Sequence, residues 1–307
     1  FRHQRDTGMT DTQTILIAGA TGSIGGGAAL ALAQRGAHVV LLGRRSDRLN
    51  AKADYIRKAL SEEPTSGGDP TVATLVVDFA DMESVRAAAS EVLGRFPTIT
   101  GLVLSVGAYL QGGPTVLPSG HEVMFATNVM GPFLFTQLLL ERMEASGGLV
   151  LHVIAPFSET IDWDDLESIE KHRSMKAFNR TKTCNRVIAG ELARRYAGRI
   201  SSVAFDPTYV IDKTDPTLAQ RWPSGLRGLL WRMMTVLFAK PPAIAGEPIA
   251  DLMLSHRDRR EINGALFKLG QRVEKPDKAM HDEVCGEKLW TQLVHSTGLC
   301  SSKQTLP

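Results

Sequence analysis

The 307-residue chain is predicted to fold as an α/β protein in which helices cover both faces of a doubly wound parallel sheet. Two observations predict this fold class. Short apolar runs alternate with longer segments whose apolar residues recur at helical spacing, which is typical of parallel sheets. A glycine-rich turn also lies directly between the first apolar run and the first such segment. We expect a sheet of about seven strands.

The expected elements follow this alternation in order. The strands are expected at residues 14–18, 38–42, 72–77, 101–106, 149–155, 201–205 and 265–268. The helices are expected at residues 26–35, 50–60, 84–93, 121–145 and 174–196. Gly36 and Gly198 stand at two helix ends, where glycine commonly stops a helix. The long helix 121–145 is expected to be adjusted at Gly131-Pro132.

Residues 9–307 are interpreted as a single domain, because no linker divides them. Residues 1–8 are polar and lack the apolar segment of a secretory signal, so we interpret them as a tag or a disordered start before Met9. Residues 207–248 are expected to form a less regular insertion.

Composition and charge exclude several function classes. Apolar residues make up 43% of the chain and charged residues 22%, ordinary values for a globular protein. The net charge of +2 is too small to indicate nucleic acid or an anionic membrane as a partner. No uninterrupted apolar run reaches the roughly 20 residues that span a bilayer. The three cysteines lack metal-ligand spacing, so we expect a cytoplasmic protein without a metal.

The glycine-rich loop is the first candidate binding feature. It lets the backbone turn tightly and approach a ligand, and the following helix N-terminus offers N–H groups to a pyrophosphate. Its place between a strand and a helix favours a Rossmann-type dinucleotide site over a plain turn. The expected cofactor contacts in this loop are Gly19, Thr21, Gly22, Ser23, Ile24 and Gly25.

Two arginines after the second strand predict which dinucleotide is bound. An acidic residue there would hold the ribose 2′-hydroxyl of NAD, but the sequence reads Gly43-Arg44-Arg45. Guanidinium groups suit a 2′-phosphate instead. The sequence therefore favours NADP(H), unless both arginines are simply solvated surface residues.

Later segments carry a family resemblance. Asn128 lies in Thr-Asn-Val-Met-Gly, Lys182 ends Phe-Asn-Arg-Thr-Lys, and Asp206-Pro207-Thr208 follows the sixth strand. With the glycine loop, these segments resemble the short-chain dehydrogenase/reductase family, nearest to its retinol-dehydrogenase-like branch. The loop departs from the usual Gly-x-x-x-Gly-x-Gly of single-domain members, because Ser23 takes the place of the middle glycine. Either spacing can hold a dinucleotide.

The resemblance implies roles for residues beyond the glycine loop. It implies that Asn128 supports a proton relay and that Lys182 holds the cofactor ribose. Asp78 stands at the acidic position that caps the adenine amine. The implied cofactor contacts outside the loop are Arg44, Arg45, Asp78, Phe79, Ser105, Val106, Gly107, Lys182, Pro207 and Val210.

Two residues that the family reaction needs are missing. The resembled enzymes exchange a proton through a tyrosine and bind the substrate oxygen with a serine. Here these positions hold Phe178 and Ala155, and a shift by one residue would place Ile154 or Pro156 at the serine position instead. One loss could be a laboratory substitution, but two favour a natural change of chemistry.

Several residues are candidates to replace the lost acid. Tyr209 and Tyr109 would otherwise be pocket walls, His152 a core histidine, and Asp212 a turn cap. The apolar stretch 222–238 corresponds to the family's lid and would suit a bulky, apolar substrate, although core packing, a dimer face or shallow membrane contact would also explain it. The expected substrate-pocket residues are Tyr109, His152, Pro156, Phe157, Tyr209, Trp222 and Leu226.

Three functions fit these observations. The first is an NADP(H)-dependent oxidoreductase with non-standard acid catalysis, which the retained Asn128 and Lys182 favour. The second is a cyclase, lyase or isomerase on the same scaffold, and the third is a non-catalytic NADP(H)-binding protein. The resemblance also implies a homodimer or homotetramer built on the two long helices.

Overall fold

The computed structural model describes residues 13–62, 65, 68–214, 225–255 and 259–299. Within these residues a single sheet has the strand order β3-β2-β1-β4-β5-β6-β7-β8. Every neighbouring pair is parallel except β7 and β8. The strands are β1 (Thr14–Ala18), β2 (His38–Gly43), β3 (Val72–Val76), β4 (Gly101–Leu104), β5 (Leu149–Val153), β6 (Ser201–Asp206), β7 (Leu266–Lys268) and β8 (Gln271–Arg272). The predicted fold class is confirmed.

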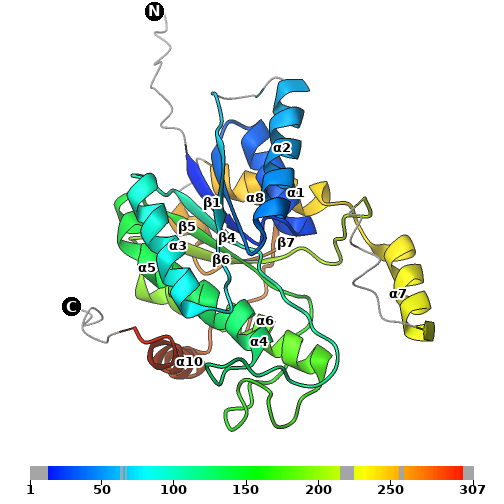
Figure 1. Cartoon of the computed structure of the whole chain (residues 1–307). Helices are drawn as coiled ribbons and strands as arrows, with labels where there is room; N and C mark the ends of the chain where they lie inside the picture. Colours follow the sequence, from blue (N-terminus) through cyan, green and yellow to red (C-terminus); the bar gives the residue numbers. More distant parts are fainter. Residues whose placement is uncertain (1–12, 63–64, 66–67, 215–224, 256–258, 300–307) are drawn as a thin grey trace, which may run out of the picture.

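Helices cover both faces of the sheet (Figure 1). One face carries α1 (Ser23–Gln34), α2 (Ser46–Glu62) and α8 (Ala243–Leu254). The other carries α3 (Met82–Arg95), α5 (Gly131–Ala145), α6 (Ser174–Arg195) and α10 (Glu283–Ser296). The described chain also contains α4 (Val123–Phe125), α7 (Gly225–Phe238) and α9 (Arg259–Ile262).

The central strand β1 shows why its sequence is apolar throughout. Its side chains alternate between the two faces, as they do in any strand. Ile15 and Ile17 pack into the core under α1 and α8, whereas Leu16 and Ala18 pack into the core under α3, α5 and α6. Because both faces are covered, all five residues of β1 are buried.

The strand order reverses between β1 and β4, and this point positions the site. In doubly wound sheets, ligands bind beyond the carboxyl ends of the strands at such a reversal. Here β1 leads into Gly19 and β4 leads into Ser105. Each of these two residues belongs to a predicted cofactor-binding segment.

The expected helix 121–145 is not uniform. It consists of α4, a π turn at Ala126–Met130 and α5. The adjustment therefore lies before Gly131-Pro132 and not at that pair. By length and composition the whole segment could cross a membrane, but 78% of the relevant window is buried inside the domain. Packing in the core accounts for its apolar character.

Two further elements differ from expectation. The strand β8 was not expected, since two residues are too few to carry a pattern. The helix α8 begins within the expected insertion 207–248 and packs against α1 at very close range. A Cβ atom on Gly27 would lie 2.7 Å from the Pro242 carbonyl oxygen, and one on Gly246 would lie 2.5 Å from the Gly27 oxygen. Glycine at both positions permits this packing.

Candidate active site

The glycine loop brings bare backbone to the start of α1. Gly19 has a left-handed φ of 81°, and a Cβ atom on it would lie 2.8 Å from the Ser105 carbonyl oxygen. A Cβ on Gly25 would lie 2.4 Å from Ser105 Oγ. The N-cap residue, Gly22, gives the first turn of α1 no side-chain cap. This uncapped helix start suits a phosphate group, so the loop fits the dinucleotide that the sequence predicts.

The two arginines after β2 differ in their surroundings. Arg44 and Arg45 are both exposed, but Arg45 forms an ion pair with Asp47 at 2.6 Å. No ion-pair partner of Arg44 is found in the described part of the chain. Thr21 reaches the end of β2, because its Cγ2 would lie 3.8 Å from a Cβ on Gly43. Of the two cations, Arg44 is the better placed to bind a 2′-phosphate.

The ends of β3 and β4 form the neighbouring walls. Asp78 is half-buried, and its Oδ1 accepts a hydrogen bond from the Ala80 amide at 3.0 Å. Phe79 is buried, with its ring edge-on to Phe135, so it supports the wall from inside. Ser105 Oγ donates to the Ala18 carbonyl at 2.7 Å, which ties β4 to β1 immediately before the glycine loop.

Asn128 is fully buried in the π turn and organises the loop after β4. Its Oδ1 accepts from the Ala108 amide at 2.7 Å, and its Nδ2 donates to the Ala108 carbonyl at 2.9 Å. The Nδ2 group also lies 3.2 Å from Thr181 Oγ1 on α6. Asn128 therefore fixes the Val106–Ala108 backbone relative to α6.

Lys182 and Phe178 lie one turn apart on α6. The Lys182 ammonium donates to the Val106 carbonyl at 2.8 Å and lies 3.4 Å from the Val153 carbonyl, so it joins the ends of β4 and β5. It also lies 5.7 Å from the centre of the Phe178 ring. Burial lowers the pKa of Lys182 to about 8. Gly107 adjoins both groups, since its Cβ would lie 3.4 Å from the ammonium nitrogen.

Ala155 lies in the half-buried turn after β5, at the position where the resemblance places a serine. Its carbonyl accepts a hydrogen bond from Arg186, and Arg186 also forms a 2.8 Å ion pair with Asp277. Both ion-pair side chains are about nine-tenths buried. The backbone at this position is thus held firmly, although its side chain offers only a methyl group.

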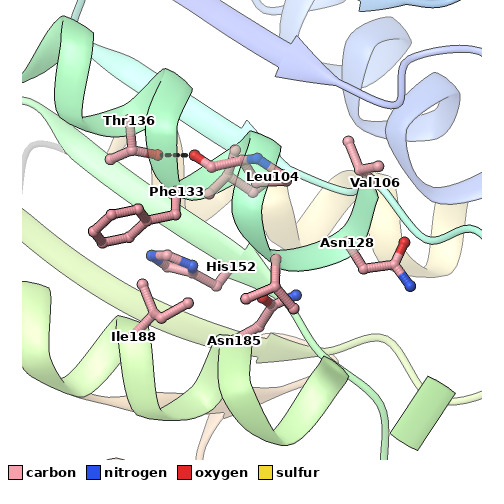
Figure 2. Close-up of a pocket in the computed structure, with 10 residues that line it drawn as sticks. Leu104, Val106, Asn128, Phe133, Thr136, His152, Asn185 and Ile188 are labelled. Atoms are coloured by element: carbon pink, nitrogen blue, oxygen red, sulfur yellow. Dashed lines mark hydrogen bonds between the residues drawn. The ribbon is translucent and has the colours of Figure 1, made fainter. Parts of the chain in front are cut away.

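His152 lies beneath the site and not in an open pocket. It is 3% exposed and lines an internal cavity of about 10 Å³, together with Asn128, Thr136 and Asn185 (Figure 2). Such a volume holds about one water. Burial, with a smaller contribution from the Lys182 charge, lowers the pKa of His152 to about 3. The histidine is therefore neutral near pH 7 and is a poor candidate for the missing acid.

The segment after β6 connects the two ends of the site. Asp212 donates its amide to Ser23 Oγ at 2.8 Å, which ties this segment to the start of α1. Val210 pairs with Lys240 in an isolated bridge, and Pro207 is buried. The Tyr209 hydroxyl lies 3.0 Å from Thr235 Oγ1 on α7. This contact directs Tyr209 toward α7, while the Asp212 carboxylate accepts from Thr214.

The structure brings two of the remaining predicted pocket residues together and places others at the surface. Tyr109 packs edge-on against Phe178, with ring centres 5.6 Å apart, so these two aromatic residues do come together. Pro156 and Phe157 are exposed, Phe157 by 67%. Trp222 and the side chain of Leu226 lie outside the described part of the structure. Sequence reasoning missed Lys52, whose half-buried ammonium lies 3.2 Å from the position of a Cβ on Gly26 in α1.

Comparison with known proteins places this arrangement in a family. Residues 13–159 match the profile of the short chain dehydrogenase family. The chain is 32% identical over 209 residues to DnrU of Streptomyces sp. (strain C5), a proposed daunorubicin C-13 ketoreductase, which covers 67% of this chain and 69% of that protein. It is 29% identical over 298 residues to retinol dehydrogenase 14 of Mus musculus, which covers 93% and 86%.

Solved structures share the fold. One is a proposed short chain dehydrogenase from Shigella flexneri complexed with NADP, with a TM-score of 0.58 and 21% identity over 84% of this chain and 96% of that one. Another is a proposed NAD(P) dependent gluconate 5-dehydrogenase from Beutenbergia cavernae with bound NADP, with a TM-score of 0.62, 22% identity, and coverage of 84% and 94%.

The fold and the site define an oxidoreductase scaffold of the dinucleotide-binding type. The chain belongs to the short-chain dehydrogenase/reductase family, near the branch that contains the retinol dehydrogenases.

Proposed function

We propose that this protein is an NADP(H)-dependent oxidoreductase that acts on a bulky, apolar small molecule with a non-standard proton donor. One observation carries the proposal. The uncapped start of α1 and the Lys182 ammonium stand at the two ends of one continuous edge of the sheet. The first suits a pyrophosphate and the second suits ribose hydroxyls, so a single dinucleotide would satisfy both.

The choice of NADP(H) over NAD(H) rests on Arg44. Arg44 is exposed and directly follows Gly43, the last residue of β2, whereas Arg45 already has Asp47 as a partner. When bound, the cofactor would supply or accept the hydride. The Lys182 ammonium would hold its ribose, and the Ser105–Gly107 backbone would form one wall.

The substrate class rests on the side chains beyond the nicotinamide end of the site. Tyr109 and Phe178 offer aromatic surface there. The helix α7, which the contact between Tyr209 and Thr235 joins to the segment after β6, carries exposed apolar side chains, among them Leu229, Met233 and Leu237. Large apolar surfaces with few polar groups favour bulky apolar ligands.

Tyr109 is the proton donor that the geometry favours. Its ring contacts Phe178, which stands at the position of the family's catalytic tyrosine. Tyr209 was the other tyrosine among the candidates, but its hydroxyl contacts Thr235 on α7. A phenol within reach of the reacting oxygen would supply the proton that Phe178 and Ala155 lack.

One alternative is favoured by the same two residues. Because neither Phe178 nor Ala155 carries an exchangeable proton, hydride transfer to a polarised C=C bond would need less from the protein, since water can protonate the carbon later. A non-redox reaction, or cofactor binding without catalysis, would also tolerate both losses.

The test begins with fluorescence titrations of the protein with NADPH and, separately, with NADH. We expect NADPH to bind at least about tenfold more tightly, the effect of one charge-assisted contact. Turnover is then measured with a polycyclic aromatic ketone and with an aromatic enone. Tyr109→Phe should abolish ketone reduction, whereas the matched variant Tyr209→Phe should retain it. Binding of neither cofactor would refute the proposal, and enone reduction that survives Tyr109→Phe would favour the alternative.

A further inference from the structure

Thr208, the second residue after β6, has a backbone conformation that its side chain disfavours. Its φ is +61°, in the left-handed region. Glycine adopts this region freely, but a β-branched residue does so only when its surroundings enforce it. Such strain concentrates at ligand clamps and active sites. The Asp206 carboxylate enforces the turn by accepting the Thr208 amide at 2.8 Å.

The Thr208 hydroxyl is also in an unfavourable environment. Its oxygen is shielded from solvent and has no hydrogen-bond partner among the residues that the structure describes. A buried hydroxyl without a partner is costly, so native proteins rarely keep one without a use. Strain and an unpartnered hydroxyl therefore coincide at a single residue.

The neighbours of Thr208 place it on the path between the two ends of the site. Phe205, three residues earlier, pairs in register with Val153. The Val153 carbonyl is 3.4 Å from the Lys182 ammonium. Four residues after Thr208, the Asp212 amide donates to Ser23 at the start of α1. A dinucleotide that reaches from α1 to Lys182 must therefore pass along the segment that contains Thr208.

We propose that Thr208 is a cofactor-contacting residue whose hydroxyl bonds a polar group on the nicotinamide half of the dinucleotide. This inference rests on the proposed function, because it needs a cofactor in the site. The strain would then be retained because threonine, unlike glycine, brings a hydroxyl to this turn. The nearby Asp212 side chain is already oriented by Thr214, whose amide and hydroxyl both donate to its Oδ1.

Three substitutions separate the hydroxyl from the strain. Thr208→Val keeps the branched shape and removes the hydroxyl, and Thr208→Ser keeps the hydroxyl. Thr208→Gly removes the hydroxyl and the strain together. We expect Thr208→Gly to raise the melting temperature of the cofactor-free protein by about 2 °C, because the left-handed turn is then relaxed.

The deciding measurement compares two ligands for each variant, NADPH and adenosine 2′,5′-bisphosphate, which lacks the nicotinamide half. We expect Thr208→Val and Thr208→Gly to bind NADPH about 5- to 10-fold more weakly, as the loss of one hydrogen bond predicts. Their affinity for the bisphosphate should stay at the wild-type value, and Thr208→Ser should bind both ligands like the wild type.

Equal NADPH binding by the wild type and Thr208→Val would overturn the inference, as would equal weakening of both ligands. If the wild type binds neither ligand, the proposed function itself fails. The two failures are therefore distinguishable.

Discussion

The two ends of the site follow the same sheet edge but differ in what they retain. At the α1 end, the features that a pyrophosphate needs are present: Gly19 and Gly25 leave room for backbone contact, and the helix start is uncapped. At the α6 end, Asn128 and Lys182 keep ordered hydrogen bonds, but the residues between them and the substrate, Phe178 and Ala155, carry no exchangeable proton. The backbone around the α6 end is ordered, whereas the positions at which the resemblance places a tyrosine and a serine hold residues without an exchangeable proton.

Under the proposed function, this contrast would separate cofactor binding from chemistry on one scaffold. The polar groups that remain at the α6 end are those that organise backbone, as Lys182 does at Val106 and Asn128 at Ala108. Such groups stay necessary for the fold even when the reaction changes, because a buried polar group that loses its partner destabilises the protein. Their presence alone is therefore weak evidence for the family reaction.

Restoring the missing groups is the strongest test of the contrast. In the Tyr109→Phe background, which lacks the proposed proton donor, the double substitution Phe178→Tyr with Ala155→Ser should raise NADPH-dependent reduction of an aromatic ketone by about 10²- to 10⁴-fold, the usual value of positioned acid catalysis. The measured quantity is kcat/KM. Phe178→Leu is the control, because it removes the ring and adds no hydroxyl. If the double variant shows no rise in kcat/KM, the α6 end of the site differs from that of the resembled enzymes in more than these two side chains.

The buried ammonium of Lys182 predicts a pH-dependent stability. Burial lowers its pKa from 10.5 to about 8. Between these values the unfolded chain binds more protons than the folded one, so the free energy of unfolding should rise as the pH rises from about 8 to 10.5. The whole rise is about 3 kcal/mol for this group. The free energy of unfolding is measured with denaturant for the wild type and for Lys182→Met across this pH range. The difference between the two plots of free energy against pH gives the contribution of Lys182.

The wild type and Lys182→Met should therefore differ most in how steeply the free energy of unfolding rises with pH. In Lys182→Met the contribution is absent, because methionine has no proton to lose. Parallel curves for the two proteins would mean that the ammonium is solvated in the folded state.

A methyl group on the glycine loop should damage cofactor binding selectively. In Gly25→Ala the new Cβ would lie 2.4 Å from Ser105 Oγ and 2.5 Å from the Gly19 oxygen, so the loop must shift. Overpacking of this kind costs about 2 kcal/mol, and if the shifted loop must return to its original shape to hold the pyrophosphate, the same cost makes NADPH binding roughly 30-fold weaker. Gly94→Ala is the matched control, since a Cβ there meets nothing within 4 Å and alanine favours a helix. Unchanged NADPH binding by Gly25→Ala would contradict the proposed cofactor position.

The smallest effect separates the two arginines. Arg44→Ala should reduce the preference for NADPH over NADH by about tenfold, the value of one charge-assisted contact. Arg45→Ala should change it less, because Asp47 already pairs with that guanidinium. Titration of both variants with NADPH and with NADH gives the ratio of the two affinities for each variant. A larger change in this ratio for Arg45→Ala than for Arg44→Ala would mean that Arg45 binds the 2′-phosphate.

The sequence predicted the sheet well because its strands are apolar and bounded by clear turns. Lys182 and Phe178 were placed correctly on their helix, since short motifs carry their own spacing. The glycine loop was expected to run through Gly25, but it ends at Gly22, because α1 already begins at Ser23. Three features were not predictable in this way. The contact between Tyr109 and Phe178 joins a loop to a helix, the partner of Tyr209 lies 26 residues away on α7, and the strain at Thr208 is a backbone property. Each depends on tertiary structure, which periodicity does not report.

The π turn at Ala126–Met130 has a consequence for how the length of this protein can change. In this turn the Gly131 amide bonds the Ala126 carbonyl, so the ring holds one residue more than an α turn. Deleting a single residue there would let the backbone close into regular α-helix without breaking the chain of hydrogen bonds. Because the π turn accommodates its extra residue locally, the helix before it and α5 after it would keep their relative orientation. Only the residues within the turn would move, and Asn128 would leave Ala108, so the deletion would act on the loop after β4 and not on the helices.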